Sequence, residues 1–256
     1  GLLRGKGEHA ADRLTIMGVW GSHILKPPTP NYPHMPELED LSMHLASLAG
    51  LAVVPHGLIR MKDGALAYFT RRVDRVGKPG AKSMTKLHME DMCQLTERQT
   101  EHKYKGSHEQ IAKAITRFAQ NTLSDQTIFY EQVLFSFLTG NADMHLKNFS
   151  LLEKEGQGLS LCPAYDLVPT ALVNPADTEE LALTLNEKKR KLNYNDFLAA
   201  YENGGLNKKV LDNTLELFQY CKPEMEAVLE KSFVSEEYKE NYYALLNNRY
   251  KQLGLK

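Results

Sequence analysis

The spacing of hydrophobic positions changes along the chain and indicates two parts. In the first part, residues 13–26, 51–60 and 65–73 form short apolar runs beside Gly and Pro, which is typical of β-strands. Between these runs, leucines recur every three or four positions over 37–49, which predicts an amphipathic helix. The first part therefore predicts a small β-rich unit with one helix.

Helical spacing dominates after about residue 76. The predicted helices cover 89–95, 107–122, 125–139, 194–203, 207–220, 222–232 and 235–253. One hairpin, 149–153 with 159–162, interrupts them at a turn containing two glycines. We therefore expect an α+β fold of two lobes, with a small β-rich N-lobe at 1–75 and a larger helical C-lobe at 76–256.

Charge and composition exclude several classes of protein. The 31 basic and 32 acidic residues give a net charge of −1, which offers no strong field for nucleic acid or an anionic membrane. No apolar run is long enough to span a bilayer. The 3 cysteines are widely spaced and odd in number, so they predict neither a disulfide framework nor a zinc site. A cytoplasmic protein is the simplest expectation.

Residues with catalytic chemistry are concentrated in the segment GNADMHLKNFS at 140–150. Asp143 and Asn148 stand five positions apart, as the base and the metal-binding Asn of protein kinases do. Asp166 follows the hairpin, where kinases carry a second metal-binding carboxylate, and Lys26 ends a predicted strand of the other lobe. This order of residues predicts a phosphoryl-transfer site.

Each of these residues also has a purely structural interpretation. Asp143 could cap its loop, Asn148 could satisfy a turn, and Asp166 could start one. His145 could be a buried, hydrogen-bonded histidine, and Lys26 a solvated strand end. A metal-dependent hydrolase with Asp143, His145 and Asp166 as ligands is a further alternative, although it leaves Lys26 without a role.

The chain resembles the HipA-like bacterial toxin kinases, whose fold is similar to that of eukaryotic protein kinases and lipid kinases. The resemblance covers roughly 20–250. The segments that carry it are HILKPP at 23–28, PELEDLSMHLASLAGL at 36–51, RRVDR at 71–75, LHMEDMCQL at 87–95, KYKG at 103–106, GNADMHLKNFSLL at 140–152, LCPAYDLVPT at 161–170 and LALTLNEKKRKL at 181–192. The last of these is similar to a later strand region of the family.

The resemblance implies roles for the candidate residues. Asp143 would be the catalytic base for a Ser or Thr hydroxyl, while Asn148 and Asp166 would hold Mg²⁺ on ATP. Lys26 would bind the α- and β-phosphates, and Glu39 on the first helix would hold Lys26 in place.

Further ATP contacts are implied for His145, Lys147, Tyr165, Arg71, Arg72, Val73 and Asp74. Lys147 would also offset charge in the transition state. Arg71 and Val73 depart from the Glu-Arg-Phe that is usual in the family, so the implied adenine contacts are mainly those of the backbone. Asp74 would reach the ribose or pair with a hinge arginine.

Two departures concern the start of the chain. The family's phosphate loop, S-x-x-G-x-Q-x-K, has no match in 1–22, and we expect 1–7 to be the strand after it or a remnant of it. Because the chain begins with Gly1, we expect residues to be missing near the start, and the autophosphorylated Ser cannot be named. From the length we expect no additional N-terminal subdomain in this chain. The chain is therefore similar to the short HipT-type variants, in which that subdomain is absent or encoded separately.

The function implied is an ATP- and Mg²⁺-dependent serine/threonine kinase that serves as the toxin of a type II toxin–antitoxin pair. Its target would be an aminoacyl-tRNA synthetase, and the resulting block in translation would cause persistence. A HipB-like DNA-binding antitoxin is the implied partner, and DNA would be contacted only through it. The basic run at 188–191 could touch phosphates or form a solvated turn. A catalytically silent kinase-like module that binds a partner remains the alternative.

Overall fold

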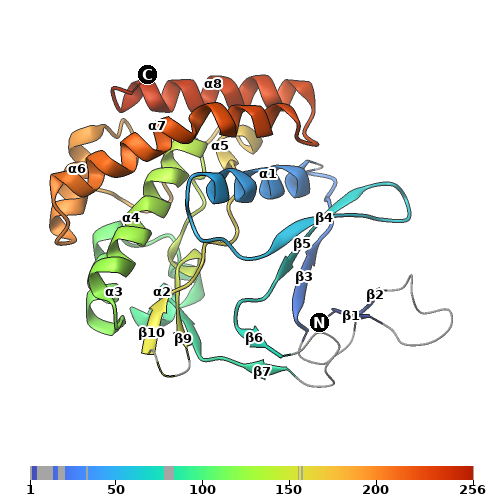
Figure 1. Cartoon of the computed structure of the whole chain (residues 1–256), viewed down its shortest axis with the longest axis horizontal. Helices are drawn as coiled ribbons and strands as arrows, with labels where there is room; N and C mark the ends of the chain where they lie inside the picture. The colour runs from blue at the N-terminus through green and yellow to red at the C-terminus, as the bar shows by residue number, and fades with distance from the viewer. Residues whose placement is uncertain are drawn as a thin grey trace.

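Most of the first part of the chain is strands with one helix, and most of the second part is helices with one small sheet (Figure 1). The computed structural model describes residues 2–4, 14–16, 21–32, 34–77, 84–154, 156 and 158–255. The predicted α+β class is confirmed in this order of elements. The placement of the lobe boundary at residue 75 stays a prediction.

A three-stranded antiparallel sheet carries the first part. Its strands are β3 (His23–Lys26), β4 (His56–Arg60) and β5 (Leu66–Arg71), in the order β3-β5-β4. Helix α1 (Met35–Leu48) packs against this sheet. The short strands β1 (Leu2–Arg4) and β2 (Leu14–Ile16) pair with each other. In the main sheet, Lys26 at the end of β3 lies opposite Tyr68 of β5, so its position depends on that register.

A second three-stranded sheet contains the predicted hairpin. Its strands are β8 (Met89–Asp91), β9 (Ser150–Lys154) and β10 (Gly158–Leu161), in the order β10-β9-β8. The prediction of a helix over 89–95 is wrong in its first half, because only α2 (Met92–Leu95) is helical. The Asp91 side chain accepts a hydrogen bond from the Gln94 amide and starts the helix there. The strands β6 (Arg75–Val76) and β7 (Thr85–Lys86) form a separate pair.

The helices of the second part follow the predicted ones closely. They are α3 (His108–Phe118), α4 (Thr122–Thr139), α5 (Thr170–Val173), α6 (Tyr194–Asn203), α7 (Lys208–Glu230) and α8 (Glu236–Gln252), with short 3₁₀ turns η1 (Thr100–His102) and η2 (Leu146–Asn148). The helices predicted at 207–220 and 222–232 are one helix, although Pro223 lies inside it. Proline removes one helical hydrogen bond. The Tyr250 hydroxyl donates to the Phe218 carbonyl across 2.9 Å, close to this interruption.

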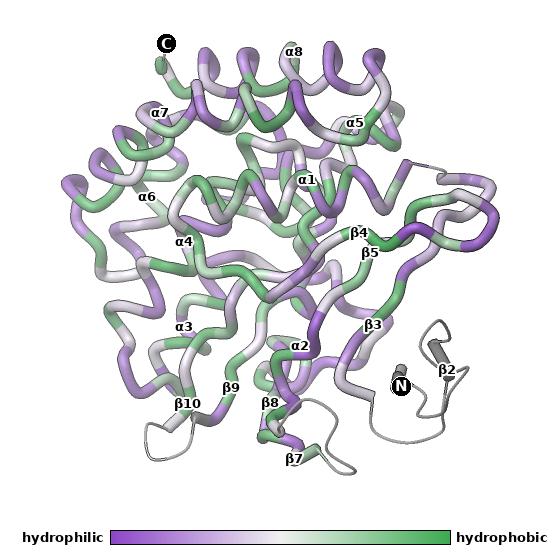
Figure 2. Tube along the Cα trace, turned by 45° about the vertical axis from the view of Figure 1, so that its right-hand side comes forward, coloured by the Kyte–Doolittle hydropathy of each residue, from purple (hydrophilic) through white to green (hydrophobic). Residues whose placement is uncertain are grey.

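One hydrophobic core connects α1 to the later helices. It contains Leu38 and Leu45 of α1, Phe129 and Leu134 of α4, and Leu246 of α8. Along α7 and α8, hydrophobic and hydrophilic residues alternate, as expected for helices with one buried side (Figure 2). Because α1 is packed into this core, the residues on it have a fixed position relative to the helical part.

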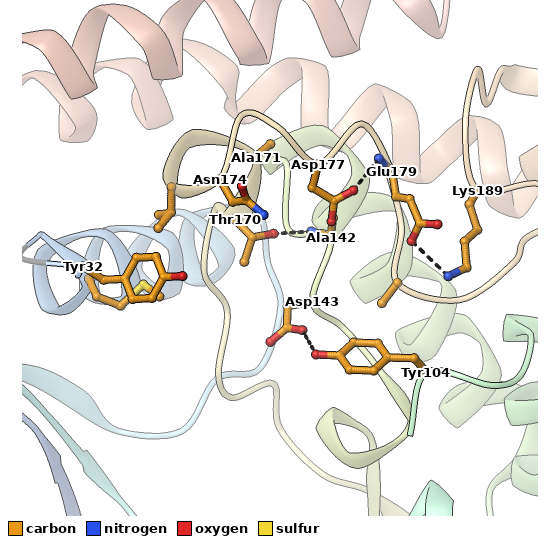
Figure 3. Close-up of a pocket in the computed structure, with 13 residues that line it drawn as sticks. Tyr32, Tyr104, Ala142, Asp143, Thr170, Ala171, Asn174, Asp177, Glu179 and Lys189 are labelled. Carbon is orange, nitrogen blue, oxygen red and sulfur yellow. Dashed lines mark hydrogen bonds and ion pairs between the residues drawn. The ribbon is translucent and has the colours of Figure 1, made fainter. Parts of the chain in front are cut away.

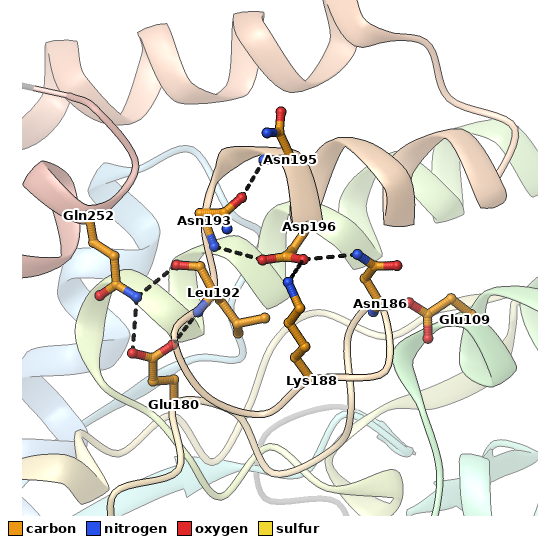
Figure 4. A network of polar contacts seen from close by, with 9 residues as sticks. All are labelled: Glu109, Glu180, Asn186, Lys188, Leu192, Asn193, Asn195, Asp196 and Gln252. Atoms are coloured by element: carbon orange, nitrogen blue, oxygen red, sulfur yellow. Dashed lines mark hydrogen bonds and ion pairs between the residues drawn. The ribbon is translucent and has the colours of Figure 1, made fainter.

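Residues 181–192 form turns and isolated bridges, so the strand expected there from the family resemblance is wrong. Asn186, Glu187 and Lys191 have positive φ angles, which an extended strand does not allow. Asp196 organises this segment by accepting hydrogen bonds from Lys188 Nζ at 2.7 Å and Asn186 Nδ2 at 2.9 Å (Figure 4).

The same contacts bear on the basic run at 188–191. Lys188 pairs with Asp196, and Lys189 pairs with Glu179 at 3.0 Å. Half of the run is therefore already neutralised by nearby carboxylates, which favours the interpretation as a turn. Separately, no helix in the described part of the chain has both the length and the apolar character that a membrane span requires.

Candidate functional site

Three charged residues from distant parts of the chain meet at the end of β3. Lys26 Nζ lies 2.8 Å from Glu39 Oε1 and also forms an ion pair with Asp166 Oδ1. Glu39 comes from α1, and Asp166 follows the β9–β10 hairpin. The predicted pair of Lys26 with Glu39 is present, and Lys26 also pairs with Asp166, the carboxylate predicted to bind metal.

Burial sets the electrostatics of this group. The Glu39 side chain is only 3% exposed, whereas those of Lys26 and Asp166 are 37% and 38% exposed. Burial raises the pKa of Glu39 to about 7, against the opposing effect of the Lys26 charge. Burial alone would lower the pKa of Lys26, but the two carboxylates outweigh it and raise that pKa. The ammonium group is therefore the stable charge around which both acids are arranged.

Asp166 has a left-handed backbone conformation, with φ of 60°. Residues other than glycine adopt this conformation at an energetic cost, and such residues cluster at functional sites. Its neighbours are fixed, because Leu167 is buried and the Tyr165 hydroxyl donates to the Lys147 carbonyl at 3.1 Å. The chain thus holds the Asp166 carboxylate toward Lys26 in a conformation that costs free energy.

The loop that carries Asp143 is fixed at both ends. Helix α4 ends at Gly140, which has a φ of 70° and takes the left-handed C-cap conformation. The Thr170 hydroxyl oxygen accepts a hydrogen bond from the Ala142 amide at 2.8 Å. Asn148 closes the loop by donating from Nδ2 to the Asp143 carbonyl at 3.2 Å. The two residues of the predicted Asp-x₄-Asn pair are therefore in direct contact.

The Asp143 carboxylate lines a pocket of about 490 Å³ (Figure 3). Tyr104 donates a hydrogen bond of 2.5 Å to its Oδ1, and this contact was not predicted from the sequence. Burial and the Asp143 charge raise the pKa of Tyr104, so its hydroxyl stays protonated and remains a donor. His145 packs edge-on against Tyr104, and burial lowers its pKa, which favours the neutral imidazole. The motif KYKG contained Tyr104, but nothing local to it pointed to Asp143.

Lys147 lies in the same loop and pairs with a residue of another strand. Its Nζ is 2.6 Å from Asp91 Oδ2. Asp91 belongs to β8, so this pair ties the loop of Asp143 and Asn148 to the second sheet. Asp91 was also missed by sequence reasoning, because the segment that contains it read as a helix.

The predicted hinge residues lie at the end of β5. The Arg71 and Arg72 amides donate to the carbonyls of Pro55 and Ser22 at 2.9 and 2.8 Å. The Arg72 guanidinium binds Asp74 through two hydrogen bonds of 3.0 Å. Of the two predicted roles for Asp74, pairing with a hinge arginine is therefore the one present.

The environment of Asp74 favours its ionised form. Burial alone would raise its pKa, but hydrogen bonds and charges from Arg72 and Arg75 outweigh this effect and hold the pKa low. Val73, which lies between Arg72 and Asp74 in the chain, is partly buried against the core. The segment predicted to be the hinge is thus held by ion pairs among its own residues.

The hydrolase alternative is not supported by the geometry. Among the described residues, the ligand atoms of Asp143, His145 and Asp166 do not converge on one point, and the grouping of His, Cys and acid side chains that does converge lies elsewhere.

The segment 1–7 was predicted to be the strand after the phosphate loop or a remnant of it. Only Leu2–Arg4 of this segment lies within the described residues.

The family described as "HipA-like C-terminal domain" matches residues 11–228. The chain belongs to this family. It is 30% identical over 226 residues to the presumed kinase Y4dM of Sinorhizobium fredii, covering 82% of this chain and 53% of that protein. It is 26% identical to the serine/threonine-protein kinase toxin HipA of Shewanella oneidensis, covering 65% of this chain and 41% of the relative.

The fold agrees with this family. The structure of Shewanella oneidensis HipA, solved with HipB and its operator DNA, superimposes with a TM-score of 0.78 at 21% identity, covering 91% of this chain and 59% of HipA. The prediction of a HipA-like, kinase-type fold is therefore confirmed. The chain spans about half the length of the first of these curated relatives.

Proposed function

We propose that this HipA-like chain forms the catalytic part of an ATP- and Mg²⁺-dependent serine/threonine protein kinase. The observation that carries the proposal is the contact of Lys26 with both Glu39 and Asp166. A lysine held by a buried glutamate and facing a second, more exposed carboxylate is the arrangement that kinases use around the ATP phosphates. Membership in the HipA-like family supports the same activity.

The residues present fit a nucleotide with Mg²⁺. Asp166 supplies carboxylate oxygens, and Asn148 supplies an amide oxygen, since its contacts with Asp143 and Met144 use Nδ2. Magnesium prefers such hard oxygen ligands. Bound there, the ion would neutralise phosphate charge, and Lys26 would pair with the α- and β-phosphates once Asp166 turns to the metal. Glu39 would keep Lys26 in place.

Asp143 is the proposed base. It would orient the acceptor hydroxyl and accept its proton, an effect of order 10²–10⁴-fold in rate. The pocket beside it gives a protein side chain room to approach from the side of α5. Lys147 and His145 in the same loop would stabilise the transferred phosphoryl group, and Tyr165 would hold the loop backbone near the nucleotide.

The hinge would bind adenine mainly through its backbone. The side chains of Arg72 and Asp74 bind each other, so they give the hinge its shape. Arg71 and Val73 would contribute backbone groups at the cleft between an N-lobe at 1–75 and a C-lobe at 76–256.

The biological role that follows from the family is that of a toxin in a toxin–antitoxin pair. A HipB-like antitoxin would bind the protein and supply the DNA contact, which suits the net charge of −1. An aminoacyl-tRNA synthetase is the proposed substrate, and its phosphorylation in the cytoplasm would slow translation and cause persistence. Autophosphorylation and a separately encoded N-terminal subdomain belong to the same proposal.

Phosphoryl transfer can be tested directly with the full gene product. The protein is incubated with radiolabelled ATP, Mg²⁺ and bacterial lysate, beside Asp143→Asn and Asp166→Asn variants. Asp212→Asn is the matched control, because Asp212 pairs with Lys208 on α7 and does not line the pocket beside Asp143. We expect a labelled band of synthetase size with the wild type and the control, and at least about 100-fold less with the two variants.

Equal labelling by all four proteins would contradict this mechanism. If no labelling is seen at all, a thermal shift with ATP and Mg²⁺ distinguishes a silent module from an active kinase whose substrate is absent from the lysate. Nucleotide at a hundred times Kd stabilises a binding protein by about 2.7 kcal/mol. A silent module that does not bind nucleotide would show no shift at millimolar concentration.

A further inference from the structure

A second cluster of ligand-type side chains lies where α1 meets β4. It consists of Asp40 and His44 on α1 and His56 on β4, and one ligand atom from each lies within 4.8 Å of the others. His56 Nδ1 is 2.9 Å from Asp40 Oδ1, and His44 Nε2 is 3.5 Å from Asp40 Oδ2. Two imidazoles thus face the two oxygens of one carboxylate.

Secondary structure holds the three side chains together. Asp40 and His44 are four positions apart and share one face of α1. The His56 ring stacks on Tyr68 of β5 with a centroid distance of 6.0 Å, and it meets the His44 ring edge-on at 4.5 Å. The position of His56 therefore follows from the sheet, independently of Asp40.

Burial and access both suit an ion at this point. Asp40 is 8% exposed, and its side-chain partners among the described residues are these two imidazoles. A buried carboxylate is costly unless a hydrogen bond, a cation or a metal compensates it. The His44 side chain is 55% exposed, so the cluster is open to solvent on one side. An ion can reach Asp40 from that side.

We propose that Asp40, His44 and His56 bind a divalent transition-metal ion, with Zn²⁺ as the best match. Two imidazole nitrogens and one carboxylate oxygen are typical zinc ligands, and three protein ligands leave the fourth position to water. Zinc bonds of about 2.0–2.1 Å place ligand atoms roughly 3.3 Å apart. The exposed His44 reaches this spacing by a small rotation, and the Asp40–His56 contact opens slightly.

The proposed site differs from the nucleotide site in both place and chemistry. Glu39 contacts Lys26, whereas the next residue, Asp40, contacts His56. An ion on Asp40 would tie α1 to β4, and α1 is the helix that carries Glu39. Magnesium demands oxygen ligands and is a poor match for two imidazoles. The proposal does not depend on kinase activity.

The test is calorimetric titration of the chelator-treated full chain with ZnCl₂. We expect one ion per chain from this site, and a Kd at least about tenfold weaker for His44→Ala. His88→Ala is the matched control, because His88 is also 55% exposed and lies 2.9 Å from Glu90 but belongs to no three-ligand group among the described residues. This variant is expected to bind like the wild type.

A second readout is thermal stability. Zinc at a hundred times Kd is expected to raise Tm by about 5–10 °C in the wild type and in His88→Ala, and clearly less in His44→Ala. With MgCl₂, any change in Tm is expected to be the same in the wild type and in His44→Ala. Absence of zinc binding by the wild type, or equal binding by wild type and His44→Ala, overturns the proposal. The cluster would then be a hydrogen-bonded link between α1 and β4 only.

Discussion

The Tyr104 hydroxyl donates a 2.5 Å hydrogen bond to Oδ1 of Asp143, joining residues that are 39 positions apart. The proposed base is thereby held in one orientation at the edge of the pocket, with its second oxygen left for the acceptor hydroxyl. Tyr104 is 45% exposed, so it contributes little to the core.

Tyr104→Phe is therefore expected to slow phosphoryl transfer without weakening nucleotide binding. Hydrogen bonds to charged groups contribute about 1.5–3 kcal/mol, and the loss of this one corresponds to a tenfold or greater fall in kcat. The labelling rate gives kcat, and a thermal shift with ATP gives nucleotide affinity.

Tyr32→Phe provides the control for this experiment. Tyr32 lines the same pocket and is 46% exposed, but among the described residues its hydroxyl has no contact with Asp143 (Figure 3). It is expected to retain the wild-type rate. If Tyr104→Phe also retains it, Tyr104 does not position the base.

The Lys26–Glu39 pair predicts strong coupling between two substitutions. Lys26→Met leaves the buried Glu39 carboxylate without its cation, and it is expected to cost about 1–2 kcal/mol of unfolding free energy. This is below the cost for a fully buried pair because Lys26 is 37% exposed. Adding Glu39→Gln removes the uncompensated acid, so the double variant should regain part of the loss. Urea unfolding of all four proteins gives the coupling, and additive losses would contradict it.

His108 predicts a fall in stability with acid. It is fully buried, neither ring nitrogen has a hydrogen-bond partner among the described residues, and burial together with the Lys189 charge lowers its pKa to about 3. The unfolded chain takes up a proton near pH 6.5, whereas the folded chain resists it until about pH 3. The unfolding free energy that depends on neutral His108 is therefore fully present above pH 6.5. It falls as the pH is lowered, by about 2 kcal/mol at pH 5.

In His108→Leu, the unfolding free energy is expected to fall by about 2 kcal/mol less between pH 8 and pH 5 than in the wild type. The leucine fits beside Phe129 and Phe149, and it removes two buried polar atoms without partners, so stability at pH 8 should be equal or higher. Urea unfolding at several pH values measures both effects. An unchanged slope would show that His108 is not the group that titrates.

Gly140 predicts a severe effect of one added methyl group. Its φ is 70°, and a Cβ there would lie 2.6 Å from Leu245 Cδ2 and 3.0 Å from Ala171 Cβ. Gly140→Ala is expected to destabilise the protein by about 2–4 kcal/mol, combining backbone strain with overpacking next to the loop that carries Asp143. Gly205→Ala is the control, because its φ is 79° but nothing lies within 4 Å of the added Cβ. It should lose only about 1 kcal/mol, and an equal loss in both would exclude the packing effect.

Much of the helical part could be predicted from local spacing. The helix predicted at 194–203 is observed there as α6 (Tyr194–Asn203), and α1, α3, α4 and α8 lie close to their predicted ranges. Local signals suffice because capping residues and the period of 3.6 are properties of neighbouring residues. The spacing between Asp143 and Asn148 likewise pointed to their loop, and the structure brings the two into contact.

Contacts between distant segments were decided by the tertiary structure alone. Residues 89–91 became a strand because β9 offered hydrogen-bonding partners, and α7 continued through Pro223 within a packed helical layer. The meeting of Lys26 with Asp166, 140 positions later, and that of Asp40 with His56 depend on how β3, β4 and α1 pack together. The local sequence contains the chemistry of each residue and the helical period, so it was enough to identify the catalytic candidates. Burial and strand pairing depend on the whole chain, so only the tertiary structure decided which of these candidates are in contact.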